Sequence, residues 1–150
     1  LKDSTIFRTV NSSYQTQYEQ LKKSGLYDTL IKEKLLVSHR EVSFEKSEYS
    51  GIYKILQPSP IPFISYPYEW CFSQLKDAAL ALLAIQKIAM EHKMVLKDAS
   101  AFNMQWFEGK PTLIDTLSFD TYIENKPWSA YLQFCQHFLA PLGWTDCEPS

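Results

Sequence analysis

The segment LKDASAFNMQWFEGKPTLIDTLSF limits what this chain can fold into more than any other part of the sequence. Its two short runs at 102–107 and 111–115 flank a turn signal at 108–109, which is the pattern of a β-hairpin. Counted outward from the turn, Asn103 lies about as far back as Asp115 lies forward. We therefore expect these two side chains to be neighbours at the open end of the hairpin.

A second carboxylate, Asp98, lies in the loop that enters this hairpin. An amide and two carboxylates can hold a hard cation through oxygen and still leave one carboxylate as a proton acceptor. Each residue alone is better explained as a turn cap, because Asp and Asn favour such positions. At this spacing, however, we interpret Asp98, Asn103 and Asp115 together as a candidate functional site.

The order Asp-x4-Asn, hairpin, then Asp after an apolar strand resembles the catalytic loop and metal-binding segment of the protein-kinase-like fold. The likeness is strongest to its aminoglycoside-phosphotransferase-like branch. In that family the first Asp orients or deprotonates the acceptor hydroxyl, while the Asn and the second Asp hold magnesium on the phosphates of ATP. The resemblance implies a catalytic role for Asp98 and metal binding by Asn103 and Asp115.

Around this site the chain departs from the family pattern. Leu96-Lys97 replaces the usual His-Arg or His-Gly, and Thr116-Leu117 replaces Phe-Gly, although Lys97 is itself a candidate cofactor-binding residue. The four glycines are scattered, so the sequence has no glycine-rich phosphate loop. These departures favour a module that binds without phosphoryl transfer. Retention of the three site residues favours an active ATP-dependent phosphotransferase acting on a small-molecule or protein hydroxyl, and both alternatives stay open.

The same resemblance implies further contacts to a nucleotide. Arg8 and Glu19 stand where the fold keeps its phosphate-contacting base and the acidic partner of that base, although a surface Arg and Glu would look the same. Residues 64–70 correspond to the hinge that meets the adenine ring, which makes Tyr66 and Tyr68 candidate cofactor-binding residues. Aromatic side chains around a proline-rich turn also pack on one another, and that alternative stays open.

A longer resemblance runs from YPYEWCFSQL through the hairpin to PWSAYLQFCQHFLAPL. It is similar to the region that precedes the methyltransferase domain in bacterial SAM-dependent methyltransferases related to nodulation-type proteins. This implies a methyltransferase domain beyond residue 150 as the partner of this chain, with SAM bound only there and with an unknown small-molecule or protein substrate. The expected fold is α+β and kinase-like: a truncated small lobe (1–63), the hinge, and a mainly helical lobe (71–150) with the hairpin at the site.

Periodicity and turn signals predict the individual elements. We expect a strand at 4–10, helices at 13–23 and 26–36, two strands within 41–58, an extended proline-rich connector at 58–68, and helices at 73–93 and 127–139.

The 73–93 helix is the most apolar. Its apolar residues form one stripe along the helix, and further apolar residues beside the stripe widen this face, so we expect burial on several sides. The stripe is Leu75, Ala79, Leu82, Ile85 and Ala89, and the widening residues are Leu80, Leu83 and Ile88. We expect Pro127 in the first turn of the last helix, Pro141 at its end, and a buried seam of Trp128, Tyr131, Leu132, Cys135, Phe138 and Leu139.

Composition excludes several classes of function. A net charge of −2 and a pI of about 5.9 give no electrostatic footprint for nucleic acid. No segment approaches the ~20 apolar residues of a membrane span. The three cysteines, Cys71, Cys135 and Cys147, lack CxxC spacing, which suggests reduced thiols and a cytoplasmic location.

Overall fold

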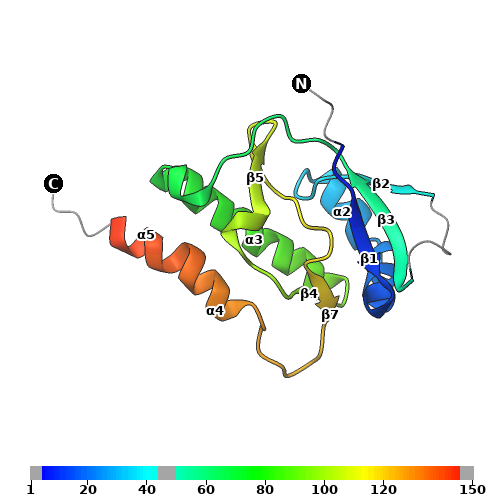
Figure 1. Ribbon diagram of the computed structural model, residues 1–150. Helices are drawn as coiled ribbons and strands as arrows, with labels where there is room; N and C mark the ends of the chain where they lie inside the picture. Colours follow the sequence, from blue (N-terminus) through cyan, green and yellow to red (C-terminus); the bar gives the residue numbers. More distant parts are fainter. Residues whose placement is uncertain (1–4, 44–49, 146–150) are drawn as a thin grey trace.

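The structure, a computed structural model, describes residues 5–43 and 50–145. Figure 1 shows a small antiparallel sheet at one side and a larger, mainly helical part at the other, joined by an irregular connector. The sheet has the strand order β1-β3-β2. Its strands are β1 (Arg8–Asn11), β2 (His39–Val42) and β3 (Ile52–Pro58). Strand β1 begins later than predicted, and residues 44–49 between the other two strands lie outside the described residues.

Two helices follow β1. A single 3-10 turn, η1 (Ser12–Tyr14), leads into α1 (Gln15–Lys23), and α2 (Leu26–Lys32) comes next. Gly25 separates the two helices with a φ of 79°, which confirms the predicted break because glycine adopts this conformation without steric cost.

Helix α2 ends four residues before the predicted end at residue 36. Lys34 has a φ of 59°, and the Leu35 N–H bonds to the Leu30 carbonyl at 2.9 Å, which is a Schellman-type end. The chain then pairs with the hairpin strand: the Val37 N–H donates to the Leu113 carbonyl at 2.9 Å. Tertiary pairing therefore outweighs the helix propensity of this leucine-rich stretch.

Helix α3 (Phe72–Glu91) crosses the centre of the molecule. All five residues of its predicted stripe are buried. The expectation of burial on several sides is wrong, because Leu80 and Leu83 on the outer face are 57% and 41% exposed. No helix within the described part of the chain is long and apolar enough to cross a membrane.

Two short antiparallel pairs pack beside α3. The predicted hairpin consists of β5 (Met104–Phe107) and β6 (Lys110–Leu113), joined by a two-residue turn at which both residues have positive φ. The sequence had not indicated the second pair, β4 (Met94–Leu96) with β7 (Phe119–Thr121). Single 3-10 turns, η2 (Pro67–Glu69) and η3 (Ala101–Asn103), lie in the connector and before β5.

The last helix differs most from its prediction. It begins at Tyr131 and runs without a break through α4 (Tyr131–Phe134), the π-helical turn η4 (Cys135–Leu139) and α5 (Ala140–Thr145). Pro141 lies inside it, because the wider π turn just before accommodates a residue that cannot donate a backbone hydrogen bond. The predicted seam is only partly correct: Phe138 is buried, together with Ala130 and Phe134, which the seam did not include, whereas three members of the predicted seam are exposed. These are Tyr131, Leu132 and Leu139.

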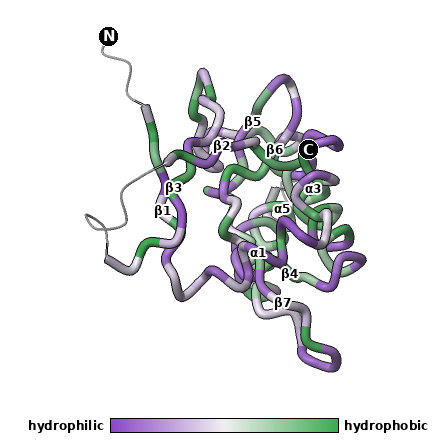
Figure 2. The backbone as a smooth tube through the Cα atoms, turned by 90° about the vertical axis from the view of Figure 1, so that its right-hand side faces the viewer, coloured by the Kyte–Doolittle hydropathy of each residue, from purple (hydrophilic) through white to green (hydrophobic). Residues whose placement is uncertain are grey.

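Within residues 5–43 and 50–145, the buried apolar residues other than Val37 form two separate clusters. The main core is formed by the buried face of α3 and by residues of α1, α2, β4 to β7 and the last helix. Among the described residues, the sheet core consists of Val10, Tyr18 and Leu56, with Tyr14, Tyr53 and Leu117 packed against it. Figure 2 shows β1 and β3 on one side of the molecule and α3, α5 and β4 on the other.

Candidate functional site

Backbone hydrogen bonds bring the Asp98 loop alongside the segment that carries Asp115. The Lys97 N–H donates to the Ser118 carbonyl, and the Ile114 N–H donates to the Asn103 carbonyl, each at 2.8 Å. Asn103 therefore lies opposite Ile114, one residue before Asp115. The convergence of the three side chains on one cation stays a prediction.

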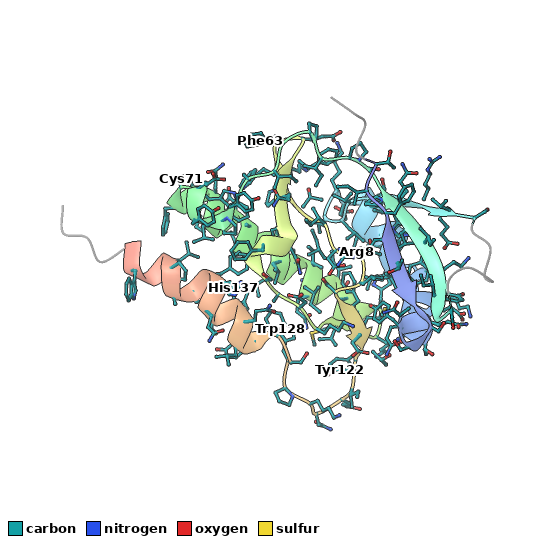
Figure 3. All side chains as sticks on the ribbon, in the orientation of Figure 1. Arg8, Phe63, Cys71, Tyr122, Trp128 and His137 are labelled. Atoms are coloured by element: carbon teal, nitrogen blue, oxygen red, sulfur yellow. The ribbon has the colours of Figure 1, made fainter. Side chains whose placement is uncertain are left out.

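The carboxylate of Asp115 is nearly buried and has two partners. Its Oδ2 lies 3.1 Å from Nη2 of Arg8, and its Oδ1 accepts the Leu117 N–H at 2.8 Å. The side chain of Asp115 is 11% exposed and that of Arg8 46% exposed. Asp98 is held more locally, since its Oδ1 accepts the N–H of Ser100 at 3.0 Å. Figure 3 shows Arg8 at the edge of the sheet that faces the helical part.

The pairing expected for Arg8 differs in the structure. Its acidic partner is Asp115, whereas Glu19 accepts hydrogen bonds from Gln15, Lys23 and Tyr53 at 2.8–3.0 Å. These hydrogen bonds, led by that of Gln15, lower the pKa of Glu19 to about 2. Glu19 thus links α1 to β3 and makes no ion pair with Arg8.

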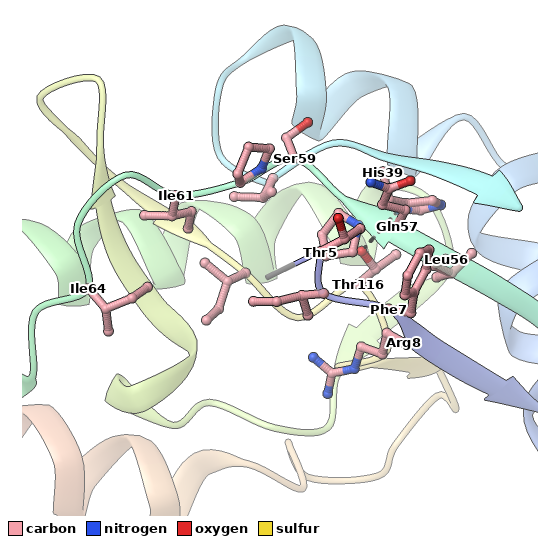
Figure 4. A pocket seen from close by; sticks show the side chains of 15 residues that line it. Thr5, Phe7, Arg8, His39, Leu56, Gln57, Ser59, Ile61, Ile64 and Thr116 are labelled. Carbon is pink, nitrogen blue, oxygen red and sulfur yellow. Dashed lines mark hydrogen bonds between the residues drawn. The ribbon is translucent and has the colours of Figure 1, made fainter. Parts of the chain in front are cut away.

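A cavity of about 670 Å³ lies between the sheet and the connector, close to the Arg8–Asp115 pair (Figure 4). Its walls are largely apolar. Gln105 fixes the connector over β5, because its side-chain amide both donates to and accepts from the backbone of Ser65, each at 3.0 Å. The apolar lining includes Ile6, Phe7, Val37, Leu56, Ile61, Ile64 and Ile114.

The two tyrosines of the predicted hinge lie outside the cavity lining. Tyr66 and Tyr68 stack on each other with ring centroids 5.4 Å apart and planes 4° from parallel, and neither lines the cavity. Lys97 Nζ lies 4.1 Å from the centre of the Tyr14 ring and is likewise outside the lining. Ile64, the first residue of the predicted hinge, does line the cavity, together with residues 59–61 of the connector and Pro58 at the end of β3. The placement of the two tyrosines supports the packing alternative, and their contact with a nucleotide stays a prediction.

His39 and Thr116 are among the polar residues of the cavity wall that sequence reasoning missed. Burial, with the charge of Lys22, lowers the pKa of His39 to about 4. The imidazole lies between the Tyr18 hydroxyl (3.0 Å from Nε2) and the Thr116 hydroxyl (3.3 Å from Nδ1). The position of Thr116 directly after Asp115 could have indicated it, whereas nothing in the sequence connects His39 to this wall.

The donor set at the candidate site fits a hard cation. Among the described residues no group of three or more His, Cys, Asp or Glu side chains could hold a metal, so a magnesium site here would need the Asn103 amide beside the two carboxylates. Carboxylate oxygens have two lone pairs each, so Asp115 can keep its partners and still bind a cation. Magnesium usually takes few protein ligands and completes its octahedron with phosphate and water oxygens.

The sequence matches no protein-family model. The fold is kinase-like: vaccinia related kinase 3 superposes with a TM-score of 0.50 at 14% identity, covering 96% of this chain and 60% of that chain. This confirms the expected kinase-like mixture of helices and strands. The chain is also similar to the nodulation protein NoeA of Rhizobium meliloti (strain 1021), with 35% identity over 139 residues. That match covers 91% of this chain and 29% of NoeA, so the chain spans less than a third of the relative.

Proposed function

We propose that this chain is a kinase-like ligand-binding module of a longer protein and that its cavity takes a nucleotide together with magnesium. The observation that carries the proposal is the cavity of about 670 Å³ with apolar walls beside the Arg8–Asp115 pair. Ligand sites in proteins are concave, mostly apolar and furnished with a few polar groups, and this volume lies within their usual range. The apolar walls suit a planar base, and the charged edge suits phosphates.

Charge accounts for the role of magnesium. Near the cavity edge Arg8 supplies one positive charge and is already paired with Asp115, while Asp98 adds a second carboxylate on the adjacent loop. A bare triphosphate would be repelled by these carboxylates. A divalent cation on Asn103 and Asp115 would neutralise part of this charge and bridge the protein to the phosphate oxygens.

We further propose that the module binds without turnover and serves a methyltransferase domain in the same polypeptide. Leu96-Lys97 and Thr116-Leu117 replace the residues that normally accompany the catalytic and metal-binding Asp, which supports binding ahead of catalysis. The resemblance to regions that precede SAM-dependent methyltransferase domains supports the accessory role, and so does the greater length of NoeA. SAM would then be bound outside residues 1–150.

The alternative, an active phosphotransferase, is favoured by one specific observation. The sequence keeps Asp98 at the spacing of the family pattern, and the Ser100 N–H donates to its carboxylate in a loop whose backbone bonds to Ser118. In this alternative Asp98 would accept the proton of a small-molecule or protein hydroxyl.

Binding is tested by thermal unfolding with and without ATP and magnesium. A ligand that binds only the native state stabilises it by RT ln(1 + [L]/Kd), about 2.7 kcal/mol at one hundred times Kd. Asp115→Asn should abolish the shift, whereas Asp77→Asn, an exposed carboxylate on α3, should leave it unchanged. No magnesium-dependent shift in the wild-type protein, in this chain and in the full-length protein alike, would contradict the proposal.

Turnover is tested separately by ATP hydrolysis with the full-length protein. The accessory-module proposal expects none above background. If hydrolysis does occur and Asp98→Asn removes it while leaving the thermal shift intact, the phosphotransferase alternative is correct. Labelled SAM should bind to the full-length protein and not to residues 1–150, and binding to the latter would contradict the placement of SAM in another domain.

A further inference from the structure

A chain of hydrogen bonds runs from the sheet surface to the cavity wall. It begins at Glu41 on β2, whose Oε2 lies 2.6 Å from Lys54 Nζ and whose Oε1 lies 2.9 Å from the Tyr18 hydroxyl. The hydrogen bond from Lys54 is the main reason that the pKa of Glu41 is lowered. Glu41 is therefore a carboxylate at neutral pH and can only accept hydrogen bonds.

This carboxylate fixes the direction of the next bond. The Tyr18 hydroxyl has one proton and two neighbours, Oε1 of Glu41 and Nε2 of His39 at 3.0 Å. The proton goes to the carboxylate, because a charge-assisted hydrogen bond is the stronger one. Nε2 of His39 must then donate to the Tyr18 oxygen. If His39 carried its proton on Nδ1 instead, the single proton of Tyr18 would have to serve both neighbours. Either the Tyr18 oxygen would face the Glu41 carboxylate without a proton between them, or it would face the lone pair of Nε2.

The tautomer of His39 determines which group is the donor in its hydrogen bond with Thr116. A neutral imidazole with its proton on Nε2 has a bare lone pair on Nδ1. The Thr116 hydroxyl lies 3.3 Å from Nδ1 and therefore donates to it. The hydroxyl proton of Thr116 is then engaged by Nδ1, so this hydroxyl can only accept a hydrogen bond from a ligand in the cavity. Thr116 and His39 both belong to the cavity wall (Figure 4).

We infer that Thr116 is a specificity-determining residue of the cavity, held as a hydrogen-bond acceptor by His39 and Tyr18. The cavity would thus prefer a planar, apolar ligand that carries an N–H or O–H donor over one of the same shape without a donor. Tyr18 and His39 act as positioning residues, since they work through Thr116. The inference rests on the proposed use of this cavity as a ligand site, but it does not depend on the ligand being a nucleotide.

The tautomer of His39 is the first test and requires no ligand. Nitrogen chemical shifts from ¹⁵N-histidine-labelled protein distinguish a protonated from an unprotonated ring nitrogen, and His39→Gln assigns the signals. At neutral pH we expect Nε2 to carry the proton and Nδ1 to be unprotonated. A proton on Nδ1 would overturn the inference, because Thr116 would then accept from His39 and point its own proton elsewhere.

The preference itself is tested with indole and benzofuran, which have nearly the same shape and differ in the N–H donor. Chemical-shift titration should show indole binding roughly three- to tenfold more tightly, the usual worth of one hydrogen bond. Thr116→Val should remove the preference, and Thr116→Ser, which keeps the hydroxyl, should retain it. Equal affinities for the wild-type protein, or no binding of either compound, would overturn the inference.

Tyr18→Phe separates positioning from simple contact. It removes the acceptor of the Nε2 proton without altering the cavity lining, so the tautomer should become mixed and the preference for indole should fall. An unchanged tautomer and preference would overturn the role of Tyr18. Because these measurements use no ATP, they can fail while magnesium-dependent ATP binding succeeds, and the reverse also holds, so the two proposals are distinguishable.

Discussion

The main core and the sheet core are stabilised in different ways. The main core gathers buried apolar side chains from most elements of the fold, with Leu82, Ile85 and Phe119 completely inaccessible. The sheet core has three buried residues, and one of them, Tyr18, carries a hydroxyl. Apolar burial contributes about 25 cal/mol per Å², so most of the stability must come from the main core.

Polar contacts compensate for the small sheet core. Three contacts connect residues 115–119 to the sheet side: the ion pair of Arg8 with Asp115, the hydrogen bond between His39 and Thr116, and the Tyr14 hydroxyl, which donates to the Phe119 carbonyl. Such contacts contribute less per group than a buried leucine, and they depend on pH and salt. The cavity lies beside the smaller of the two cores, and ligand-binding regions are commonly among the less stable parts of a protein.

The largest expected effect is in the main core. Leu82→Ala should lower the free energy of unfolding by about 2–5 kcal/mol, because it leaves a cavity at a residue with 0% exposure. Leu80→Ala on the same helix is the matched control, and at 57% exposure it should change stability by less than about 0.5 kcal/mol. Urea unfolding measures both. Similar losses for the two variants would show that α3 packs differently from the structure.

A smaller effect is expected in the sheet core. Tyr18→Phe keeps the ring but removes the hydroxyl that bonds to Glu41 and His39, so the free energy of unfolding should fall by about 1–3 kcal/mol. Amide exchange should speed up in β1 and β3 and stay unchanged in α3, because the loss is local. Uniform acceleration throughout the chain would show that the two cores unfold as one unit.

The sheet side should also be the pH-sensitive region. The pKa of His39 is lowered to about 4, so between about pH 6.5 and pH 4 the unfolded chain binds a proton that the folded protein does not. This contribution to stability is present above pH 6.5 and is lost as the pH falls. With allowance for partial exposure, we expect a loss of about 1–2 kcal/mol between pH 7 and pH 5. His39→Gln should flatten this slope, and an equal slope in both proteins would contradict the assignment.

The same contrast explains what the sequence could predict. The stripe of α3 and the hairpin turn follow from local periodicity and turn residues, and both were predicted correctly. The end of α2 and the β4–β7 pair depend on contacts between distant segments, which no local pattern contains. The last helix was misjudged at Pro141 because a π-helical turn cannot be foreseen from a proline rule.

For the candidate site, too, local patterns could be predicted from the sequence and contacts between distant segments could not. The spacing of Asp98, Asn103 and Asp115 was visible in the sequence because the three lie in one hairpin region. The partner of Arg8 was wrong, since β1 and the Asp115 segment are far apart in the chain and Glu19 is satisfied by nearer donors. The contact between His39 and Thr116 forms only through folding, so no local motif predicts it.

The smallest expected effect on stability concerns Arg8. Its ion pair with Asp115 is half exposed on the arginine side, so Arg8→Gln should cost less than about 1 kcal/mol. Raising the salt concentration should narrow the difference from the wild-type protein, because the Debye length is about 10 Å at 0.1 M. Arg40→Gln is the control: Arg40 is exposed on β2 and bonds to neutral Gln57, so its loss should be insensitive to salt. Urea unfolding at two salt concentrations measures both. A loss above about 2 kcal/mol for Arg8→Gln would mean that this single pair anchors the sheet, and the contrast between an apolar main core and a sheet held by many weak polar contacts would have to be abandoned.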